Sequence, residues 1–587
     1  MPRLLMLLSL LTSVSTTTCL VTPTLAADAS RPNVVMILAD DQGWGDLSIH
    51  GNQNIATPNI DQLAKDGARF DWFYVCHLCA PTRAEMLTGR FYGRTGVRGV
   101  STGQERLNLD EKTIAQYFKE AGYATGAFGK WHNGMQFPYH PNARGFDEYY
   151  GFCSGHWGHY FSPELDHNNT LVRCEGYITD DLTNHAIEFI AANQDKPFFC
   201  YVPYCTPHSP MQVPDQYYDK FANMDPSMKN RDPEKEQVGM TRAALAMCEN
   251  VDWNVGRILK TLDDLDLAKN TIVIYFSDNG PNSWRWNGDM KGRKGSIDEG
   301  GTRVPCFIRY PGTIKPETQI SEIAGAVDFL PTLLDFAGIE TTYPQPIDGR
   351  SLKPLLTGKE VAWPDRALIA SRNHQISVRN QAYRLDNDGK LYNILEDIGQ
   401  RHDVSQQHPD VAQELKQIAQ QYRTEMLPKD DHRPFTVGYS ASTPLPARDG
   451  VAHGEIKRSA PAPNCSYFTD WKTTEGTITW DVEVGEPGTY EAIVYYTCPT
   501  ENVGVEIQAE LLGQKTAATI NQAHDPAAYG PERDRFHRGA ESPVKDFKPF
   551  SLGTLELPQG HGTLTLSAPK IPGGGAIEVR YVWLNRQ

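Results

Sequence analysis

The sequence has little that would suit a membrane or a nucleic acid. Its apolar stretch from Leu4 to Leu11 is far shorter than the roughly 20 residues that a bilayer-spanning helix needs. No block of the chain is rich in Lys and Arg, and the formal net charge is -16. Because nucleic acids are bound by clustered cations, this composition argues against such a partner. An anionic substrate would have to be captured by a small local group of cations.

Cysteine is sparse, and the chain shows no internal repeat and no low-complexity tract. The 11 cysteines are spread thinly over 587 residues, so disulfides are not the scaffold of the fold. Cys465 and Cys498 are a plausible pair in the C-terminal region. A chain of this length exceeds one ordinary core, which predicts two or more domains.

The N-terminus has the features of a secretion signal. Arg3 precedes the apolar stretch, Thr- and Ser-rich sequence follows, and small residues surround Ala26 and Ala27. We therefore predict a signal peptide over residues 1–27, a mature chain that starts near Asp28, and export to the periplasm or outside the cell.

Apolar runs alternate with helical patterns over the first half of the chain. Asn33 to Leu38 is a short continuous apolar run, typical of a strand buried on both faces of a parallel sheet. The alternation predicts an α/β domain with a mostly parallel sheet. Functional residues of such sheets lie beyond the carboxyl ends of the strands, where Asp40, Lys130, His208 and Asp278 each follow a predicted strand. The other runs and the longest helical segment are Tyr123–Phe128, Pro197–Val202, Thr271–Phe276 and Thr241–Leu262.

The second half of the chain changes character twice. Short strand-like segments between 366 and 397 and a helix from Pro409 to Met426 predict a small antiparallel subdomain, at about 360–430 of a catalytic domain spanning 28–433. Residues 434–463 are rich in Pro, Gly, Ser and Ala, which predicts a linker. Period-two alternation over 464–587 predicts a β-sandwich, loosely similar to carbohydrate-binding modules of the jelly-roll type. A packing module without a ligand is the alternative.

The run from Cys79 to Arg90 reads CAPTRAEMLTGR, a Cys-x-Pro-x-Arg core with a Leu-Thr-Gly-Arg tail. It resembles the signature of the formylglycine-dependent type I sulfatases, which are arylsulfatase-like members of the alkaline phosphatase superfamily. The resemblance covers roughly Arg31 to Met426. It implies an alkaline-phosphatase-like sheet flanked by helices, with the small antiparallel subdomain at its C-terminal end.

The resemblance also implies a chemistry for Cys79. In this family a maturation enzyme oxidises the cysteine to formylglycine (3-oxoalanine), and the hydrated aldehyde attacks sulfur. The hydrate places two hydroxyls on one carbon, so one can displace the sulfate ester and the other can later expel the sulfate.

Two acidic pairs stand at predicted strand ends. Asp40 and Asp41, together with Asp278 and Asn279, form an all-oxygen set that suits a hard divalent cation. The resemblance implies that these four residues and the modified Cys79 bind one ion. Calcium is the first choice and magnesium the second.

Cationic residues follow the same pattern. Lys130 and His132 are two residues apart and point the same way if the backbone is extended. The resemblance places both in a sulfate pocket, assigns Lys294 to the sulfate and bridging oxygens in preference to Arg293, and has Arg83 hydrogen-bond the aldehyde hydrate. These cations would meet the negative charge of the transition state.

The run from Glu299 to Pro305, EGGTRVP, resembles the end of the family's second signature. We expect Glu299 and Arg303 to be structural and to pair with each other across that loop.

His208 lies between prolines in the run TPHSP, which denies this segment a helix. The resemblance implies that it, or Lys294, protonates the leaving oxygen. The resemblance gives Asp278 the proton of the attacking hydroxyl and His132 the proton of the second one.

Two loops predict the substrate. The runs GHWGHY (155–160) and SWRWN (283–287) carry side chains that stack on sugars and pair with their carboxylates or sulfates. They favour a sulfated glycan, although ordinary loop packing would also account for them. A phosphonate or phosphate ester hydrolase of the same superfamily, and a non-catalytic glycan binder with unmodified Cys79, remain as alternatives. The candidate substrate-binding residues are His156, Trp157, His159, Trp284 and Arg285.

Overall fold

The computed structural model describes residues 31–359, 363–427 and 432–587. The predicted signal peptide at 1–27, and residues 28–30 of the predicted catalytic domain, lie outside the described residues.

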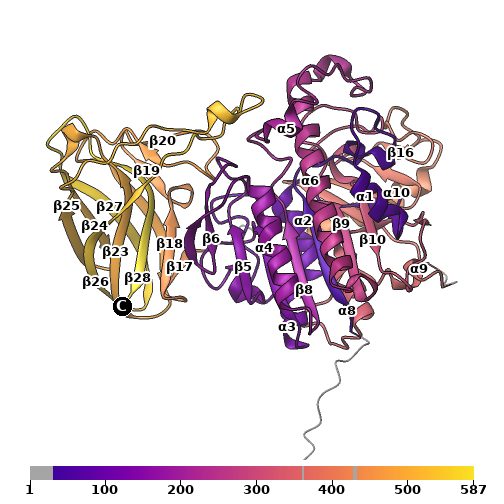
Figure 1. The fold of residues 1–587 in the computed structure, drawn as a ribbon, viewed down its shortest axis with the longest axis horizontal. Coiled ribbons are helices and arrows are strands. Elements are labelled where there is room, and N and C mark those ends of the chain that lie inside the picture. The colour runs from indigo at the N-terminus through magenta and orange to yellow at the C-terminus, as the bar shows by residue number, and fades with distance from the viewer. Residues whose placement is uncertain (1–30, 360–362, 428–431) are drawn as a thin grey trace, which may run out of the picture.

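A ten-stranded mixed sheet forms the centre of the catalytic domain (Figure 1). Its five middle strands are parallel in the order β9-β1-β8-β4-β5, so the predicted parallel sheet is confirmed. The flanking strands are β10 (Cys306–Arg309), β2 (Ala68–Phe70), β11 (Thr318–Ile320), β6 (Glu164–His167) and β7 (Thr170–Arg173). The parallel strands are β9 (Thr271–Ser277), β1 (Asn33–Ala39), β8 (Phe198–Pro203), β4 (Ala124–Lys130) and β5 (Glu148–Phe152).

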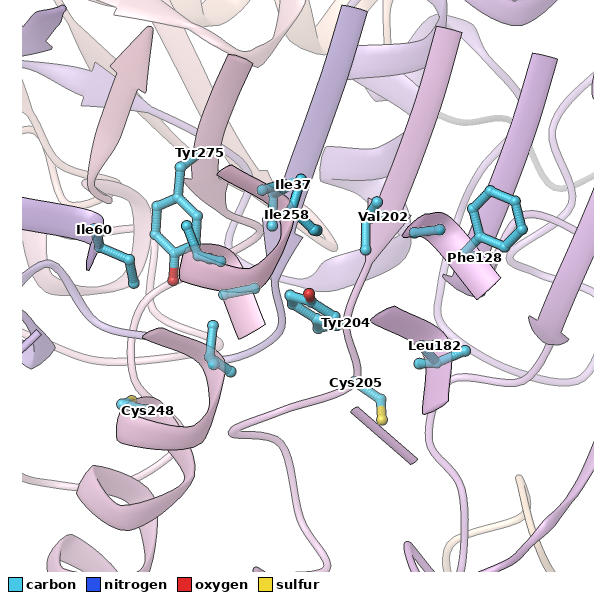
Figure 2. Close-up of a cluster of buried hydrophobic side chains, with 14 of the residues drawn as sticks. Ile37, Ile60, Phe128, Leu182, Val202, Tyr204, Cys205, Cys248, Ile258 and Tyr275 are labelled. Carbon is cyan, nitrogen blue, oxygen red and sulfur yellow. The ribbon is translucent and has the colours of Figure 1, made fainter. Parts of the chain in front are cut away.

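Both faces of this sheet are covered, which explains why its strands are continuously apolar. On one face, Ile37 and Val202 pack towards Leu182 of α4 (Ile178–Ala192) and Ile258 of α6 (Val238–Asp264), as Figure 2 shows. The other face is covered by α2 (Cys79–Thr88), α3 (Ile114–Glu120) and α8 (Phe329–Ala337). Alternate residues of β1 serve the two faces.

The carboxyl ends of the middle strands meet at one edge. The backbone N–H of Asp40 donates to the carbonyl of Thr206 at 3.1 Å, and the N–H of Asp278 donates to Ala39 at 3.2 Å. The loops that carry the candidate catalytic residues are therefore joined by backbone hydrogen bonds.

The predicted small subdomain is present as a four-stranded antiparallel sheet. Helix α10 (Pro409–Glu425) packs on it, and a shared apolar cluster that includes Tyr74 and Phe91 connects it to the main domain. It forms one side of the pocket described below. Its strands are β13 (Leu368–Arg372), β14 (Gln375–Arg379), β15 (Tyr383–Leu385) and β16 (Leu391–Asn393).

The C-terminal residues form two six-stranded sheets around a separate apolar core. Strand β22 (Thr477–Val484) alternates buried and more exposed residues, as the period-two pattern predicts. The other long strands are β23 (Gly488–Thr497), β24 (Glu506–Leu511), β25 (Gln514–Thr519), β26 (Lys548–Leu557), β27 (Gly560–Lys570) and β28 (Glu578–Arg586).

The predicted linker at 434–463 is wrong. Strand β17 (Phe435–Val437) pairs with β22, and β18 (Ser442–Pro446) pairs with β28, so this segment belongs to the two sheets. Two further short strands, β19 (Val451–His453) and β20 (Lys457–Arg458), follow. Proline is tolerated at the edge of a sheet, and strands this short carry no readable alternation. We propose that the C-terminal module spans residues 435–587.

The ten cysteines that the structure describes are all buried free thiols. The expected pair of Cys465 and Cys498 is not formed, because Cys465 Sγ donates to the carbonyl of His156 at 3.2 Å and Cys498 Sγ lies near the carbonyl of Pro499. Among the described residues, no helix combines the length and the apolar character needed to cross a bilayer.

Candidate active site

Cys79 is the first residue of helix α2, whose ten residues are all buried. The residue is 4% exposed. Burial raises the pKa of its thiol, although Lys130 and Lys294 act in the opposite direction. The helix therefore holds residue 79 at its N-terminal end, inside the protein and beside two lysines.

Carboxylates converge on this position. The candidate ligand atoms of Asp40, Cys79 and Asp278 all lie within 4.8 Å of one another, and those of Asp40, Asp41 and His208 form a second such group. Asn279 Nδ2 donates to Asp41 Oδ1 at 2.8 Å, and the backbone N–H of Asp41 donates to Asp278 Oδ1 at 3.2 Å. The four predicted metal ligands thus lie together, fully buried.

Two oxygens of this group lack a donor. Asp40 Oδ1 and Asn279 Oδ1 are buried and have no hydrogen-bond partner within the described part of the chain. A buried acceptor without a partner is costly, and a hard cation bound by carboxylate and amide oxygens would satisfy both. The donor set therefore fits a divalent cation.

Each aspartate is also paired with a cation. Lys130 Nζ lies 2.6 Å from Asp40 Oδ2, and both side chains are completely buried. Lys294 Nζ lies 2.6 Å from Asp41 Oδ1 and 2.8 Å from its Oδ2. In the third pair, Arg83 Nη2 lies 2.9 Å from Asp278 Oδ2. The charges of the three cations and the three carboxylates therefore cancel in the protein alone.

The aspartates differ in their acidity. Burial acts to raise the pKa of Asp41, but Lys294 and then His208 outweigh it and hold this pKa well below its ordinary value. Burial and the nearby Asp40 raise the pKa of Asp278 to about 6. The two carboxylates therefore have opposite surroundings within one site.

His132 is buried with one nitrogen free. Its Nε2 lies 2.8 Å from the carbonyl oxygen of Val100, so Nε2 carries the proton of the neutral ring. Its Nδ1 has no hydrogen-bond partner among residues that the structure describes. Burial and then Lys130 place the pKa of His132 well below its ordinary value. The prediction that an extended backbone points Lys130 and His132 the same way is wrong, because β4 ends at Lys130 and His132 has a φ of 64°.

His208 is fixed through its other nitrogen. Nδ1 donates to the carbonyl of Ser209 at 2.6 Å, and Nε2 lies 3.6 Å from Asp41 Oδ2. Burial and then Lys294 lower its pKa to about 3. The free nitrogen thus faces the carboxylate that Lys294 also contacts.

A cavity of about 770 Å³ opens beside Lys294. Trp284 lines it, with Lys235 Nζ 5.1 Å and the Arg293 guanidinium 5.2 Å from the ring centroid. Arg372, from the small antiparallel sheet, also lines it. Trp284 therefore lines the cavity, and its contact with a substrate stays a prediction.

Arg285 does not face this cavity, and the prediction that it binds substrate is wrong. Its side chain is 1% exposed and makes five hydrogen bonds, including 2.8 Å and 2.7 Å contacts with Asp46 and a 3.0 Å bond to the carbonyl of Asp41. It stabilises the loop below the site.

The loop at 155–160 is divided. The ring of His156 stacks on that of His208 at 5.8 Å and 17°, so His156 lies at the site. Trp157 stacks on Phe152 and lies under Arg580, and His159 contacts Tyr529 edge-on at 5.2 Å. Trp157 and His159 therefore pack against the C-terminal module and line a small pocket there, not the cavity beside Lys294, and their contact with substrate stays a prediction.

The side chains of Glu299 and Arg303 do not pair with each other, although the Arg303 backbone N–H donates to the Glu299 carbonyl at 2.8 Å. Glu299 Oε1 lies 2.8 Å from Arg384 Nε and 3.4 Å from Arg379 Nε. The Arg303 guanidinium instead lies between the rings of Trp44 and Trp72, at 4.9 Å and 4.1 Å.

Sequence reasoning missed residues that come from distant parts of the chain. Lys235 and Arg372 line the cavity, and Asn464 and Glu541 of the C-terminal module reach the loops that carry His156 and His208. Each stands alone, outside every motif that marks the site in the sequence, so the sequence carried no signal for it.

Two family models match the chain. The sulfatase model matches residues 32–339, and that of the N-sulphoglucosamine sulphohydrolase C-terminal region matches 293–423. The chain is 31% identical over 419 residues to the uncharacterized sulfatase YdeN of Escherichia coli (strain K12), covering 61% of this chain and 72% of that protein. It is 32% identical over 373 residues to N-acetylgalactosamine-6-sulfatase of Mus musculus, covering 57% and 68%.

Solved structures agree. Ps i-CgsB in complex with k-i-k-neocarrahexaose has a TM-score of 0.62 and 31% identity, and the match covers 68% of this chain and 93% of that one. BT4656 in complex with D-glucosamine-2-N,6-O-disulfate has a TM-score of 0.57 at 24% identity, with 68% and 100% coverage, and shows the same fold.

The fold and the site define an enzyme of the alkaline-phosphatase-like superfamily. Within that superfamily the chain belongs to the sulfatase family, and it is a sulfuric ester hydrolase.

Proposed function

We propose that this sulfatase removes sulfate from a sulfated carbohydrate, with formylglycine at position 79 and a calcium ion bound by Asp40, Asp41, Asp278 and Asn279. One observation carries the proposal: the ligand atoms of Asp40, Cys79 and Asp278 converge within 4.8 Å, directly beside Lys130 and Lys294.

The charge balance of the site supports an anionic substrate. The three aspartates are neutralised by Lys130, Lys294 and Arg83, so a bound divalent cation leaves a local surplus of positive charge. When bound, that cation polarises a sulfate oxygen and lowers the pKa of a neighbouring hydroxyl. Hydrated formylglycine supplies two hydroxyls on one carbon, which no encoded side chain offers. The attraction between this surplus of positive charge and an anionic substrate is stronger in a buried site than in water.

The protein's own residues then hold the substrate and move protons. Lys130 and Lys294 contact the sulfate, and Arg83 is fixed for hydrogen bonding because its Nη1 also donates to the carbonyl of Lys130 at 2.5 Å. His132 has an unshared pair at Nδ1 and takes a proton there.

The leaving oxygen is served from the other side of the site. Nδ1 of His208 donates to Ser209 and the neutral ring carries no proton on Nε2, so His208 protonates the leaving oxygen only after Nε2 has bound a proton, which a nearby anionic substrate favours. Lys294 contacts the same carboxylate, Asp41, that faces this nitrogen. Both groups are therefore placed to protonate the departing alcohol.

The cavity supports a carbohydrate rather than a small aryl sulfate as the substrate. Its volume of about 770 Å³ lies within the usual range for ligand pockets. Trp284 offers a ring for stacking on a sugar, and Lys235, Arg293 and Arg372 can pair with further sulfates or carboxylates. The carrageenan-type and glucosamine sulfates named in the related complexes are of the same class.

Export and maturation complete the proposal. A signal at 1–27 would deliver the protein to the periplasm or outside the cell, and the N-terminal sequence of the secreted protein is then expected to start near Asp28. A formylglycine-generating enzyme is the required partner. Protein from a host without that enzyme should retain the Cys79 mass and lack turnover.

The test replaces the reacting residue. We expect Cys79→Ala and Cys79→Ser to fold and to abolish hydrolysis of both an aryl sulfate and sulfated oligosaccharides. Cys306→Ala removes another buried thiol, in β10 and outside the site, and should retain turnover. Peptide mass at position 79 and bound-metal content are measured on the same samples. Undiminished turnover in Cys79→Ala, or faster hydrolysis of the phosphate than the sulfate ester of one phenol, would contradict the proposal.

A further inference from the structure

The C-terminal module reaches the active site through one segment. Residues 529–545, here named the arm, leave the sheets and extend over the catalytic domain; Figure 1 shows a golden loop running from the C-terminal sheets towards α5 (Asp215–Tyr218). The arm includes a single turn of 3-10 helix, Pro531–Arg533, and is otherwise irregular.

The arm is hydrogen-bonded to the loop that carries His208. Ser209 Oγ donates to Glu541 Oε1 at 2.5 Å. Gln212 Nε2 donates to the carbonyl of Gly530 and to Asp534 Oδ1, both at 2.8 Å. The loop is thus held in its middle and towards its end by one segment that lies over 300 positions away in sequence.

A further arginine extends this contact. The backbone N–H of Arg535 donates to the carbonyl of Met211 at 2.8 Å, and its side chain donates to Val213 and pairs with Asp215. The whole segment from Ser209 to Asp215 therefore follows the arm.

These bonds lead directly to the ring of His208. The residue that Glu541 holds, Ser209, is also the residue whose carbonyl accepts the proton of His208 Nδ1. Tyr160 Oη donates to the carbonyls of both His208 and Ser209 at 3.1 Å. Glu541 is the part of this support that comes from the C-terminal module.

The opposite flank of the ring is supported in the same way. His156 stacks on His208, and the side chain of Asn464, also from the C-terminal module, lies 3.2 Å from His156 Nδ1. Asn464 Oδ1 in turn accepts from Ser101 Oγ at 3.0 Å. Two residues of the module thus hold the two groups that flank His208.

Glu541 lies close enough to Lys294 for their charges to interact. Burial raises its pKa to about 7, with Ser209 and Arg538 acting against this, followed by Lys294. Its Oε2 is buried and, in the part of the chain that is described, accepts no hydrogen bond. A buried carboxylate with an unpaired oxygen is costly. The hydrogen bond from Ser209 is the one that the Glu541 side chain accepts among the described residues.

We infer that Glu541 and Asn464 are positioning residues of the active site: they keep His208 Nε2 directed at the leaving oxygen, and the C-terminal module is part of the catalytic unit. The inference rests on the proposed role of His208. It assigns the module a function other than carbohydrate capture at a distance.

A double-mutant cycle on the full-length, formylglycine-containing and metal-loaded protein tests this. The variants are Glu541→Ala, His208→Ala and the double variant, and the substrates are aryl sulfates with good and poor leaving groups. We expect Glu541→Ala to lower kcat about tenfold for poor leaving groups, with KM nearly unchanged, because one hydrogen bond in the support is lost. In the His208→Ala background, Glu541→Ala should have almost no further effect.

Two further variants separate positioning from folding. Glu541→Gln keeps an acceptor for Ser209 and should retain most of kcat. Glu510→Ala, which removes an exposed partner of Lys515 in the same module, should change nothing. Hydrogen exchange of the peptide covering 206–215 should rise in Glu541→Ala and Asn464→Ala, and stay unchanged in Glu510→Ala.

The outcomes are distinct. Equal effects of Glu541→Ala with and without His208, or no effect with His208 present, overturn the inference. If Glu541→Gln is as damaging as Glu541→Ala, a hydrogen-bonded support is also refuted. If His208→Ala itself leaves turnover unchanged, the failure lies in the proposed role of His208, and the inference falls with it.

Discussion

The buried pair of Arg285 and Asp46 makes a quantitative prediction. Both side chains are 1% exposed, and two contacts of 2.7 and 2.8 Å join them. Asp46→Asn keeps the shape of the side chain but leaves the Arg285 charge buried without a carboxylate. Breaking a pair of this kind costs about 3–5 kcal/mol, so the free energy of unfolding should fall by that amount.

The matched control is an exposed pair. Lys260 and Asp264 on α6 are 2.6 Å apart but 73% and 58% exposed. Asp264→Asn should therefore cost about 0.3–0.5 kcal/mol at most, because solvent screens the interaction. Urea unfolding followed by tryptophan fluorescence compares the two variants on the same scale.

The same pair decides between two roles for Arg285. If it is structural, Arg285→Met should lose stability to a similar extent as Asp46→Asn. Because Arg285 also donates to the carbonyl of Asp41, Arg285→Met should lower kcat with little change in KM for the substrate. A stable Arg285→Met protein with a raised KM would refute the assignment and restore the substrate contact that the sequence suggested.

Further predictions concern pH, proton transfer, substrate and metal. Burial raises the pKa of Glu85 from 4.5 to about 8, so the folded protein keeps this proton longer than the unfolded chain. Wild type should therefore lose stability relative to Glu85→Gln as pH rises from about 4.5 to about 8, by up to about 1.4 kcal/mol per pH unit, and an unchanged difference in unfolding curves would contradict this. His208→Ala and Lys294→Ala should both depress kcat more for aryl sulfates with poor leaving groups, and only Lys294→Ala should also depress it strongly for good ones. Trp284→Ala should raise KM for a sulfated oligosaccharide and leave that of an aryl sulfate unchanged, as steady-state kinetics would show. Chelation should abolish turnover, calcium should restore it, and full activity of metal-free protein would exclude the proposed cation site.

The parts of the site that the sequence predicted share one property. Asp40 and Asp278 directly follow a buried parallel strand and Lys130 is the last residue of one, and the carboxyl ends of such strands meet at one edge whatever the loops do. Their neighbourhood is therefore a consequence of the sheet, and an apolar run in the sequence is enough to locate it.

The parts that the sequence did not predict depend on partners far away. Arg285 is buried because Asp46, 239 residues before it, supplies the opposite charge, and nothing near Arg285 indicates that partner. Glu541 meets Ser209 across 332 residues. The segment at 434–463 has the composition of a linker and no alternation, because strands of two to five residues at a sheet edge need none.

The depth at which Cys79 lies also fixes when it could be converted. Cys79 is 4% exposed and begins a helix whose ten residues are all buried, so a modifying enzyme cannot bind the stretch of chain around it once the domain has folded. On the proposed chemistry, oxidation has to take place while the polypeptide is still emerging or in transit. An enzyme that acts at that moment meets an unfolded chain, so it must recognise residues that are adjacent to Cys79 in the sequence. That requirement explains why the residues from Cys79 to Arg90 form a continuous sequence motif, whereas the other residues of the site come from distant parts of the chain.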